Sequence, residues 1–105
     1  MNTANNEELP GCTYEERNLI KETLIAIFGP HCTFSVFGSR VNGTHRANSD
    51  LDVLISSDQP IPLRAFAYAK ESFEESNLSF RVDLLDKANL TNSFIEQIRA
   101  DLVAL

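Results

Sequence analysis

The chain has few of the features that mark several large classes of protein. Its 105 residues include only two cysteines, four glycines, four prolines and no tryptophan. Basic residues are also scarce, because nine Lys and Arg stand against fifteen Asp and Glu, for a net charge of −6. A domain that grips nucleic acid normally presents a broad basic surface to the phosphates. We therefore expect no strong direct binding to nucleic acid.

Long hydrophobic runs are absent as well. No apolar stretch approaches the roughly 20 residues that cross a membrane, and the opening MNTANNEELPG has neither the basic start nor the apolar core of a signal peptide. Cys12 and Cys32 lack the spacing of metal ligands. We expect a cytoplasmic protein that does not associate with membranes, with two reduced thiols that take no part in its function.

The remaining composition suits one small domain, since 43% of the residues are hydrophobic. We expect a flexible N-terminus over residues 1–12 and a single domain over residues 13–105. Apolar periodicity predicts helices and strands in the order helix, strand, strand, helix, strand, helix, over 13–28, 33–38, 51–56, 63–76, 78–86 and 91–102. This order predicts an α+β fold, with a small mixed β-sheet and helices packed on one side of it.

Two aspartates stand at the beginning of the second predicted strand. Residues i and i+2 of a strand point to the same face, so the Cα atoms of Asp50 and Asp52 are expected to lie roughly 6.6 Å apart. Carboxylates at this separation can converge on one or two hard cations such as Mg²⁺. An Asp-x-Asp pair is also common in ordinary turns, and taken alone it fits the turn better.

Gly38 and Ser39 end the preceding strand, and ten residues separate Ser39 from Asp50. Glycine allows a ligand to approach closely, and serine offers a hydroxyl and a backbone N–H to a phosphate. Gly-Ser after a strand is by itself more often a turn. If the two strands are antiparallel neighbours, however, a phosphate cradle lies beside a metal-binding pair. Arg40 and Arg46 are placed to reach phosphates, although exposed arginines are more often simply solvated.

A third carboxylate is available in the last predicted strand. Asp83 stands between Val82 and Leu84, where a charge is costly unless it is paired or bound to a metal. It would complete a cation site or take the proton from an attacking hydroxyl. Asp86 is the competitor, and we favour Asp83 because solvation at the strand's end explains Asp86.

Other readings of these motifs fail on single residues. A P-loop needs a lysine after its second glycine, and Thr44 follows Gly43. An EF-hand needs a further oxygen ligand after Asp52, but Val53 and Leu54 follow. In a D-x-D phosphatase, an apolar strand directly precedes the nucleophilic aspartate. Here Ala47-Asn48-Ser49 precedes Asp50 instead.

The pattern Gly38-Ser39, ten residues, Asp50-Leu51-Asp52 is the signature G-S-x10-D-x-D. Together with Asp83 in VDLL, it resembles the polymerase-beta-like nucleotidyltransferase superfamily over nearly the whole chain. The similarity is greatest to the minimal nucleotidyltransferases, the MNT subunits of HEPN/MNT toxin–antitoxin pairs. The chain has no defensible aromatic slot for a base, and larger relatives carry a second domain for that task.

The resemblance implies a Mg-dependent transfer of NMP, with AMP from ATP as the first choice, to a hydroxyl on a partner protein. Asp50, Asp52 and Asp83 would be the catalytic residues and would hold two Mg²⁺ ions, while Gly38, Ser39 and Arg40 would bind the nucleotide. The implied partner is a helical HEPN-domain protein encoded by an adjacent gene. It would be a toxic ribonuclease that is modified on tyrosine, and this chain would be its antitoxin.

Two other functions stay open at the level of sequence. In the first, the chain binds a nucleotide or masks its partner without turnover, but degenerate members of such families usually lose an aspartate and this chain keeps all three. A stand-alone transferase acting on a small molecule is disfavoured by the short length, because recognition of the acceptor normally needs more protein.

Overall fold

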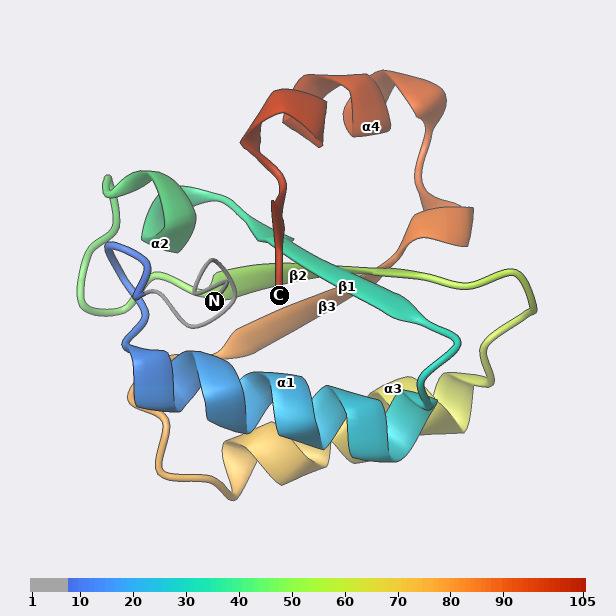
Figure 1. Ribbon diagram of the computed structural model, residues 1–105, viewed down its shortest axis with the longest axis horizontal. Coiled ribbons are helices and arrows are strands. Elements are labelled where there is room, and N and C mark those ends of the chain that lie inside the picture. The colour runs from blue at the N-terminus through green and yellow to red at the C-terminus, as the bar shows by residue number, and fades with distance from the viewer. Residues whose placement is uncertain (1–7) are drawn as a thin grey trace, which may run out of the picture.

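A computed structural model describes residues 8–105, which form one mixed sheet with helices on both of its faces (Figure 1). The first half of the chain forms α1 (Tyr14–Phe28), β1 (Thr33–Phe37), α2 (Ser39–Asn42) and β2 (Leu51–Ser56). The second half forms α3 (Leu63–Glu74), β3 (Val82–Asp86), the 3₁₀ turn η2 (Lys87–Asn89), α4 (Asn92–Ile98), the 3₁₀ turn η3 (Arg99–Asp101) and β4 (Val103–Ala104). The expected helices and strands are present, and α2 and β4 are additional.

The strands lie in the order β3-β2-β1-β4. β2 is antiparallel to β1 and parallel to β3, and β4 is antiparallel to the other side of β1. The α+β class and the small mixed sheet are thus confirmed. The end of the chain after β4 is held to β1, because the backbone N–H of Leu105 donates to the carbonyl of Phe34 at 3.0 Å. The buried guanidinium of Arg17 also donates to the carbonyl of Ala104 at 2.6 Å.

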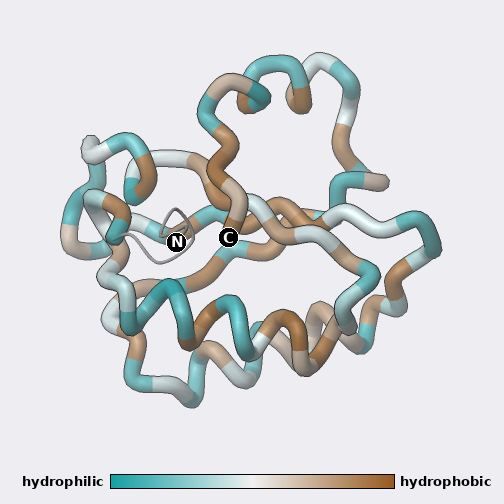
Figure 2. The backbone as a smooth tube through the Cα atoms, viewed as in Figure 1, coloured by the Kyte–Doolittle hydropathy of each residue, from teal (hydrophilic) through white to brown (hydrophobic). Residues whose placement is uncertain are grey.

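α1 and α3 cover one face of the sheet, and α4 covers the other. α1 and α3 bury residues such as Ile20 and Phe73 in the main core against the strands, and Figure 2 shows hydrophobic residues along the strands and in bands on these helices. α4 packs on the opposite face, where Ile98 joins a second cluster with Phe37 and Leu54. This differs from the expectation of helices on one side. Apolar residues on both faces of β2 make both packings possible.

Residues 8–12, the end of the segment that we expect to be flexible, contact the rest of the domain. Cys12 is only 3% exposed, and the backbone N–H of Gly11 donates to the carbonyl of Arg40 at 2.7 Å. Thr13 then begins α1 through a capping box with Glu16, as the sequence predicts. Residues 1–7 lie outside the described part of the chain, and the flexible N-terminus over residues 1–12 stays a prediction.

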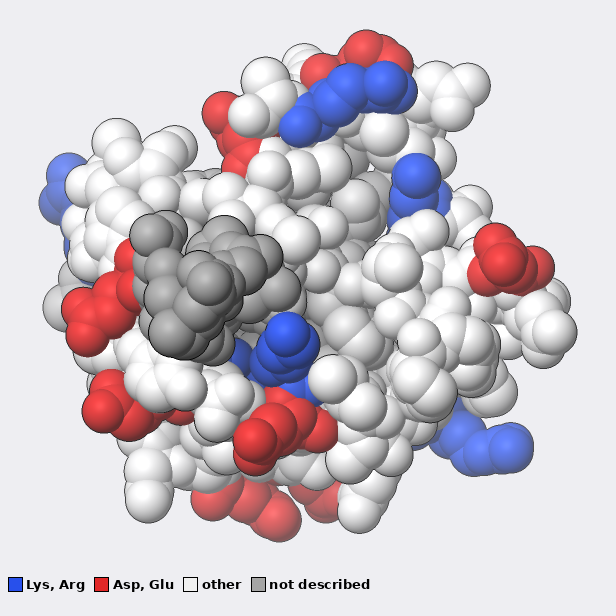
Figure 3. Space-filling model, viewed as in Figure 1, with Lys and Arg blue, Asp and Glu red and all other residues white. Residues whose placement is uncertain are grey.

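The surface and the thiols agree with the composition. On the face shown in Figure 3, acidic and basic side chains are scattered among uncharged ones, without a broad basic patch. Cys12 and Cys32 are both free and buried. Within residues 8–105 there is no helix with the length and hydrophobicity that crossing a membrane requires.

Candidate functional site

The sheet brings the predicted residues together at one of its ends. In the parallel ladder Asp52 of β2 lies directly beside Asp83 of β3. In the antiparallel ladder Asp52 lies opposite Phe37, the last residue of β1. Gly38 and Ser39 follow Phe37 in the chain, so the end of β1 and the beginnings of β2 and β3 meet at one place. The antiparallel neighbours that the sequence argument required are therefore present.

Gly38 is a glycine because of the carboxylate beside it. Its φ is +94°, a left-handed conformation that side chains rarely adopt. A Cβ placed on Gly38 would also collide with Oδ2 of Asp52. Ser39 then begins α2, in which the carbonyl of Gly38 accepts hydrogen bonds from the N–H groups of Val41 and Asn42, each at 3.0 Å. The Gly-Ser turn and Asp52 are thus in direct contact across the end of the sheet.

Asp52 carries the strongest electrostatic perturbation among the carboxylates of the site. Its pKa is raised from 3.8 to about 6, first by burial and then by repulsion from the charges of Asp83 and Asp50. Its carboxylate has no ion-pair partner among residues 8–105. The three aspartates lie close enough to repel one another, and such a cluster lowers its free energy by binding a cation.

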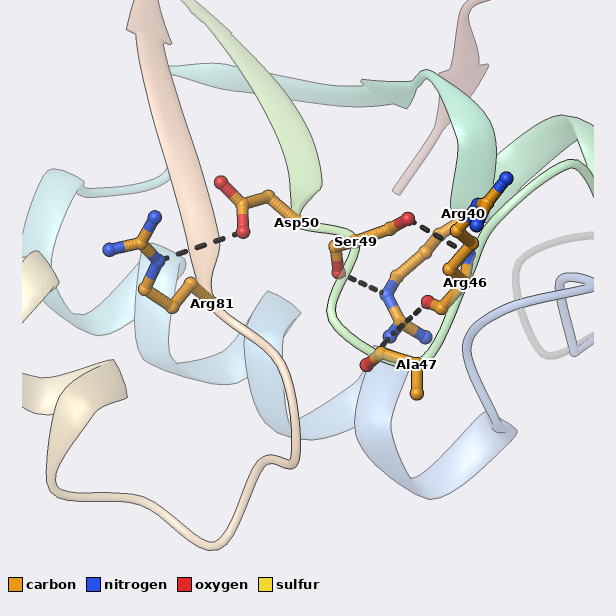
Figure 4. A network of polar contacts seen from close by, with 6 residues as sticks. All are labelled: Arg40, Arg46, Ala47, Ser49, Asp50 and Arg81. Atoms are coloured by element: carbon orange, nitrogen blue, oxygen red, sulfur yellow. Dashed lines mark hydrogen bonds and ion pairs between the residues drawn. The ribbon is translucent and has the colours of Figure 1, made fainter.

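Asp50 is partly neutralised by a cation of the protein. Nε of Arg81 lies 3.6 Å from Oδ1 of Asp50, and the two side chains are 78% and 35% exposed (Figure 4). In the part of the chain that the structure describes, no three His, Cys, Asp or Glu side chains lie together as a ready metal cage. Asp52 and Asp83 are neighbours in the ladder, while Asp50 precedes β2 and is turned toward Arg81.

The family follows from comparison with known proteins. The protein-family model described as nucleotidyltransferase domain matches residues 17–104 of this chain. The chain belongs to the nucleotidyltransferase domain family. It is also 42% identical over 91 residues to a protein of Haemophilus influenzae named probable protein adenylyltransferase MntA, a match that covers 87% of this chain and 79% of that protein.

Solved structures share the fold of this nucleotidyltransferase. One is a crystal structure of a toxin-antitoxin with AMP-PNP, at a TM-score of 0.70 and 24% identity, which covers 83% of this chain and 69% of that one. Another is a mutant of the toxin-antitoxin MntA-HpeT, at a TM-score of 0.69, 22% identity and the same coverage. At these identities the likeness shows the fold, and it agrees with the mixed sheet and its helices.

The register places Asp83 of the nucleotidyltransferase in the carboxylate cluster, although the argument from burial does not hold. The side chain of Asp83 is exposed, whereas Asp86 is half-buried. Asp86 lies beside Ile55, toward the other end of β3, and its Oδ1 accepts the N–H of Ala88 at 3.1 Å. Asp86 therefore caps the turn after β3, and position in the ladder distinguishes it from Asp83.

Arg40 is buried rather than solvated, and its guanidinium is engaged within the protein, while the expectation that it binds the nucleotide stays a prediction. It is 6% exposed, and its guanidinium lies 4.1 Å from the centre of the Phe80 ring. Its N–H groups donate to the backbone carbonyls of Ser49, Arg46 and Ala47 at 2.7 to 3.3 Å (Figure 4). They also donate to the carbonyl of Gly11 at 2.8 Å. Arg40 thus ties the loop before Asp50 to the N-terminal segment and fixes where β2 begins.

Sequence reasoning missed the pairing of Arg81 with Asp50 and the clamp formed by Arg40. The first was within reach, because a parallel pairing of Leu51 with Val82 places the preceding residues, Asp50 and Arg81, beside each other. The second depends on the path of the loop from Gly43 to Asp50, for which the sequence offers no periodic signal. Arg46 does hold this loop, since its backbone N–H donates to Oγ of Ser49 at 2.9 Å.

A groove of about 850 Å³ opens beside the carboxylates. It lies between α3 and β3, and its lining includes Asp50 and Asp83 as well as Phe66 and Lys70 of α3. A second groove of about 540 Å³ lies between the end of α1 and the beginning of α3, and it includes none of the three aspartates. Only the first of these two grooves therefore adjoins the candidate site.

Proposed function

We propose that this nucleotidyltransferase transfers an NMP, AMP from ATP in the first instance, to a hydroxyl on a partner protein in the cytoplasm. The observation that carries the proposal is the contact of Gly38 with Asp52, which lies beside Asp83 in the ladder. It joins a turn without a side chain, suited to a phosphate, to a cluster of mutually repelling carboxylates. This is the arrangement that a triphosphate bound with cations requires.

The donor set fits Mg²⁺. Carboxylate oxygens are its preferred protein ligands, and it keeps further positions for waters and substrate phosphates, so a complete protein cage is not needed. Asp52 and Asp83 would hold the ions, two in number, together with Asp50 once it exchanges Arg81 for metal. When bound, magnesium would neutralise the triphosphate and make the α-phosphorus easier to attack.

The residues of the chain then divide the work. Gly38 and Ser39 would hold the terminal phosphates at the start of α2, next to the carboxylate of Asp52. Asp83, whose carboxylate is exposed, would take the proton of the acceptor hydroxyl. The hydroxyl oxygen would form a bond to the α-phosphorus, and the bond from that phosphorus to the bridging oxygen would break, so that pyrophosphate leaves.

The partner is proposed from the relatives. The curated relative is named as a probable protein adenylyltransferase, and the solved structures with this fold are toxin-antitoxin complexes. We propose that this chain is the antitoxin of such a pair. Its acceptor would be a helical HEPN-domain ribonuclease encoded by the adjacent gene and modified on tyrosine.

Transfer of label tests this function. The purified chain is incubated with Mg²⁺ and α-labelled ATP, with and without the HEPN protein of the adjacent gene. We expect label on that protein from α-labelled but not from γ-labelled ATP. The variant Asp50→Asn/Asp52→Asn should transfer none, whereas Asp58→Asn, which removes an exposed carboxylate from a turn after β2, should transfer normally.

The same assay separates catalysis from masking. Two results together would refute catalysis and indicate a masking role. The HEPN protein would stay unlabelled with every nucleotide, and the double variant would still neutralise it.

A further inference from the structure

The groove beside the site lies along an open edge of the sheet. β3 is an edge strand, and within residues 8–105 no strand pairs with its outer side. In the ladder with β2, the N–H of Leu51 donates to the carbonyl of Arg81 at 2.9 Å. Along β3, every second residue directs its N–H and C=O toward β2, as Arg81 does, and the residues between them direct theirs away from it. The backbone groups of Val82 and Leu84 therefore point outward. The edge therefore offers unused donors and acceptors next to the groove.

The lining of the groove suits an extended polypeptide. Phe66, Phe73 and Leu84 supply apolar surface, and Lys70, Glu74 and Arg81 supply charges of both signs. The ring of Phe73 is already buried and that of Phe66 packs edge-on against another aromatic ring in the core. A flat base thus finds no broad exposed ring for stacking. Alternating backbone groups at the edge instead match a peptide strand.

The position of the groove also matches the needs of the reaction. Asp50 and Asp83, the carboxylates proposed to act on the acceptor, are among the residues that line the groove. Along β3 the side chain of Asp83 alternates with those of Val82 and Leu84, so an added strand would turn alternate side chains toward the groove and toward Asp83. A segment that runs along β3 would pass the exposed carboxylate of Asp83.

We propose that the acceptor protein binds by adding an extended segment to the outer edge of β3. Its apolar side chains would enter the groove between α3 and β3, and its hydroxyl would be presented to Asp83. The identity of the occupant as the acceptor rests on the proposed function, whereas the addition of a strand can be measured independently of transfer.

Hydrogen exchange tests the strand addition directly. The probe is the HEPN protein of the adjacent gene, added without nucleotide to the full chain. We expect the amides of Val82 and Leu84 to exchange at least about tenfold more slowly in the complex. The amide of Val103 in β4, at the opposite edge, is the internal control and should not change. Unchanged exchange at Val82 and Leu84, including through failure of the HEPN protein to bind, overturns the proposal.

A matched pair of variants tests the groove. Ala67 is exposed on α3 and lines the groove, whereas Glu71 is exposed one turn later and does not. Ala67→Trp should fill the groove and raise KM for the acceptor protein by about tenfold, as expected for loss of a few apolar contacts. Glu71→Trp should leave KM unchanged, and both variants should keep the ATP affinity of the parent. Equal KM values for the two variants overturn the proposal.

The outcomes separate this inference from the proposed function. Slowed exchange along β3 without any transfer of label would refute the nucleotidyl transfer while supporting the docking edge. Transfer of label without slowed exchange, and with equal KM for the two Trp variants, would support the enzyme and overturn the docking edge.

Discussion

Replacing Asp52 by asparagine should stabilise the metal-free protein at neutral and alkaline pH. The carboxylate is half-buried, lies beside two other aspartates and has no ion-pair partner among residues 8–105. Its ionisation therefore costs folding free energy, which Asp52→Asn avoids while keeping the shape of the side chain. A residue placed in the proposed site for its chemistry would thus reduce the stability of the fold.

The magnitude follows from the pKa of Asp52, which rises from 3.8 to about 6. At about 1.4 kcal/mol per pKa unit, this corresponds to roughly 3 kcal/mol. Because the side chain is partly exposed, solvent screening reduces the expected gain to about 1 to 2 kcal/mol. In a domain of this size, that gain corresponds to a rise in Tm of roughly 5 to 12 °C.

The sign of the pH dependence is fixed by the direction of the shift. Because the folded protein holds the proton on Asp52 more tightly than the unfolded chain, the parent loses stability as pH rises from about 4 through 6. The gain of Asp52→Asn should therefore be absent near pH 3.5, grow between pH 4 and 6, and stay constant above about pH 7.

Thermal unfolding in EDTA at pH 3.5, 5 and 8 measures this effect, with Asp58→Asn as the control for removing one acidic charge. An Asp52→Asn protein that is no more stable than the parent at pH 8, or that gains equally at pH 3.5, would refute the reasoning. Addition of Mg²⁺ at pH 8 should stabilise the parent and have little effect on the variant, because the ligand has been removed.

Three further predictions concern residues around the site. Gly38→Ala should lower the free energy of unfolding, measured in denaturant, by about 2 to 4 kcal/mol, because the new Cβ clashes and the φ is strained. Gly43→Ala, also at positive φ but without a close contact, should lower it by only about 1 kcal/mol. Arg40→Leu should cost about 3 kcal/mol in the same assay by stranding buried carbonyls, and Arg99→Leu, an exposed partner of an ion pair, less than about 0.5. Burial raises the pKa of Cys12 to about 11. Alkylation of this thiol by iodoacetamide at pH 8, followed by mass spectrometry, should therefore be at least about a hundredfold slower than that of free cysteine. Equal rates would show that the thiol is accessible.

Much of the site could be predicted because its chemistry is local. Gly38, Ser39, Asp50 and Asp52 are held by two strand ends and a short loop, so spacing alone limits how far apart they can lie. Asp83 was predicted on the wrong ground, since it is exposed. Its place depends on β3 pairing with β2 in a particular register, and the apolar pattern indicates a strand without specifying its neighbour.

The remaining features depend on contacts between distant parts of the chain. Arg40 reads in the sequence as one more loop arginine, and only its path into the carbonyls around Gly11 and Ala47 makes it a structural residue. The position of α4 was equally hidden. β2 offers Leu54 on one face and Val53 and Ile55 on the other, and both faces are able to bury a helix.

The clamp of Arg40 makes the start of the domain and the loop before Asp50 one mechanical unit. Gly11 both accepts from the guanidinium of Arg40 and donates to its backbone carbonyl, so a pull on the chain ahead of α1 is transmitted to that loop. A partner that gripped the N-terminal residues would thereby shift Asp50 without touching it. Removal of residues 8–12 would break both hydrogen bonds between Gly11 and Arg40 and release one end of this clamp beside the candidate site.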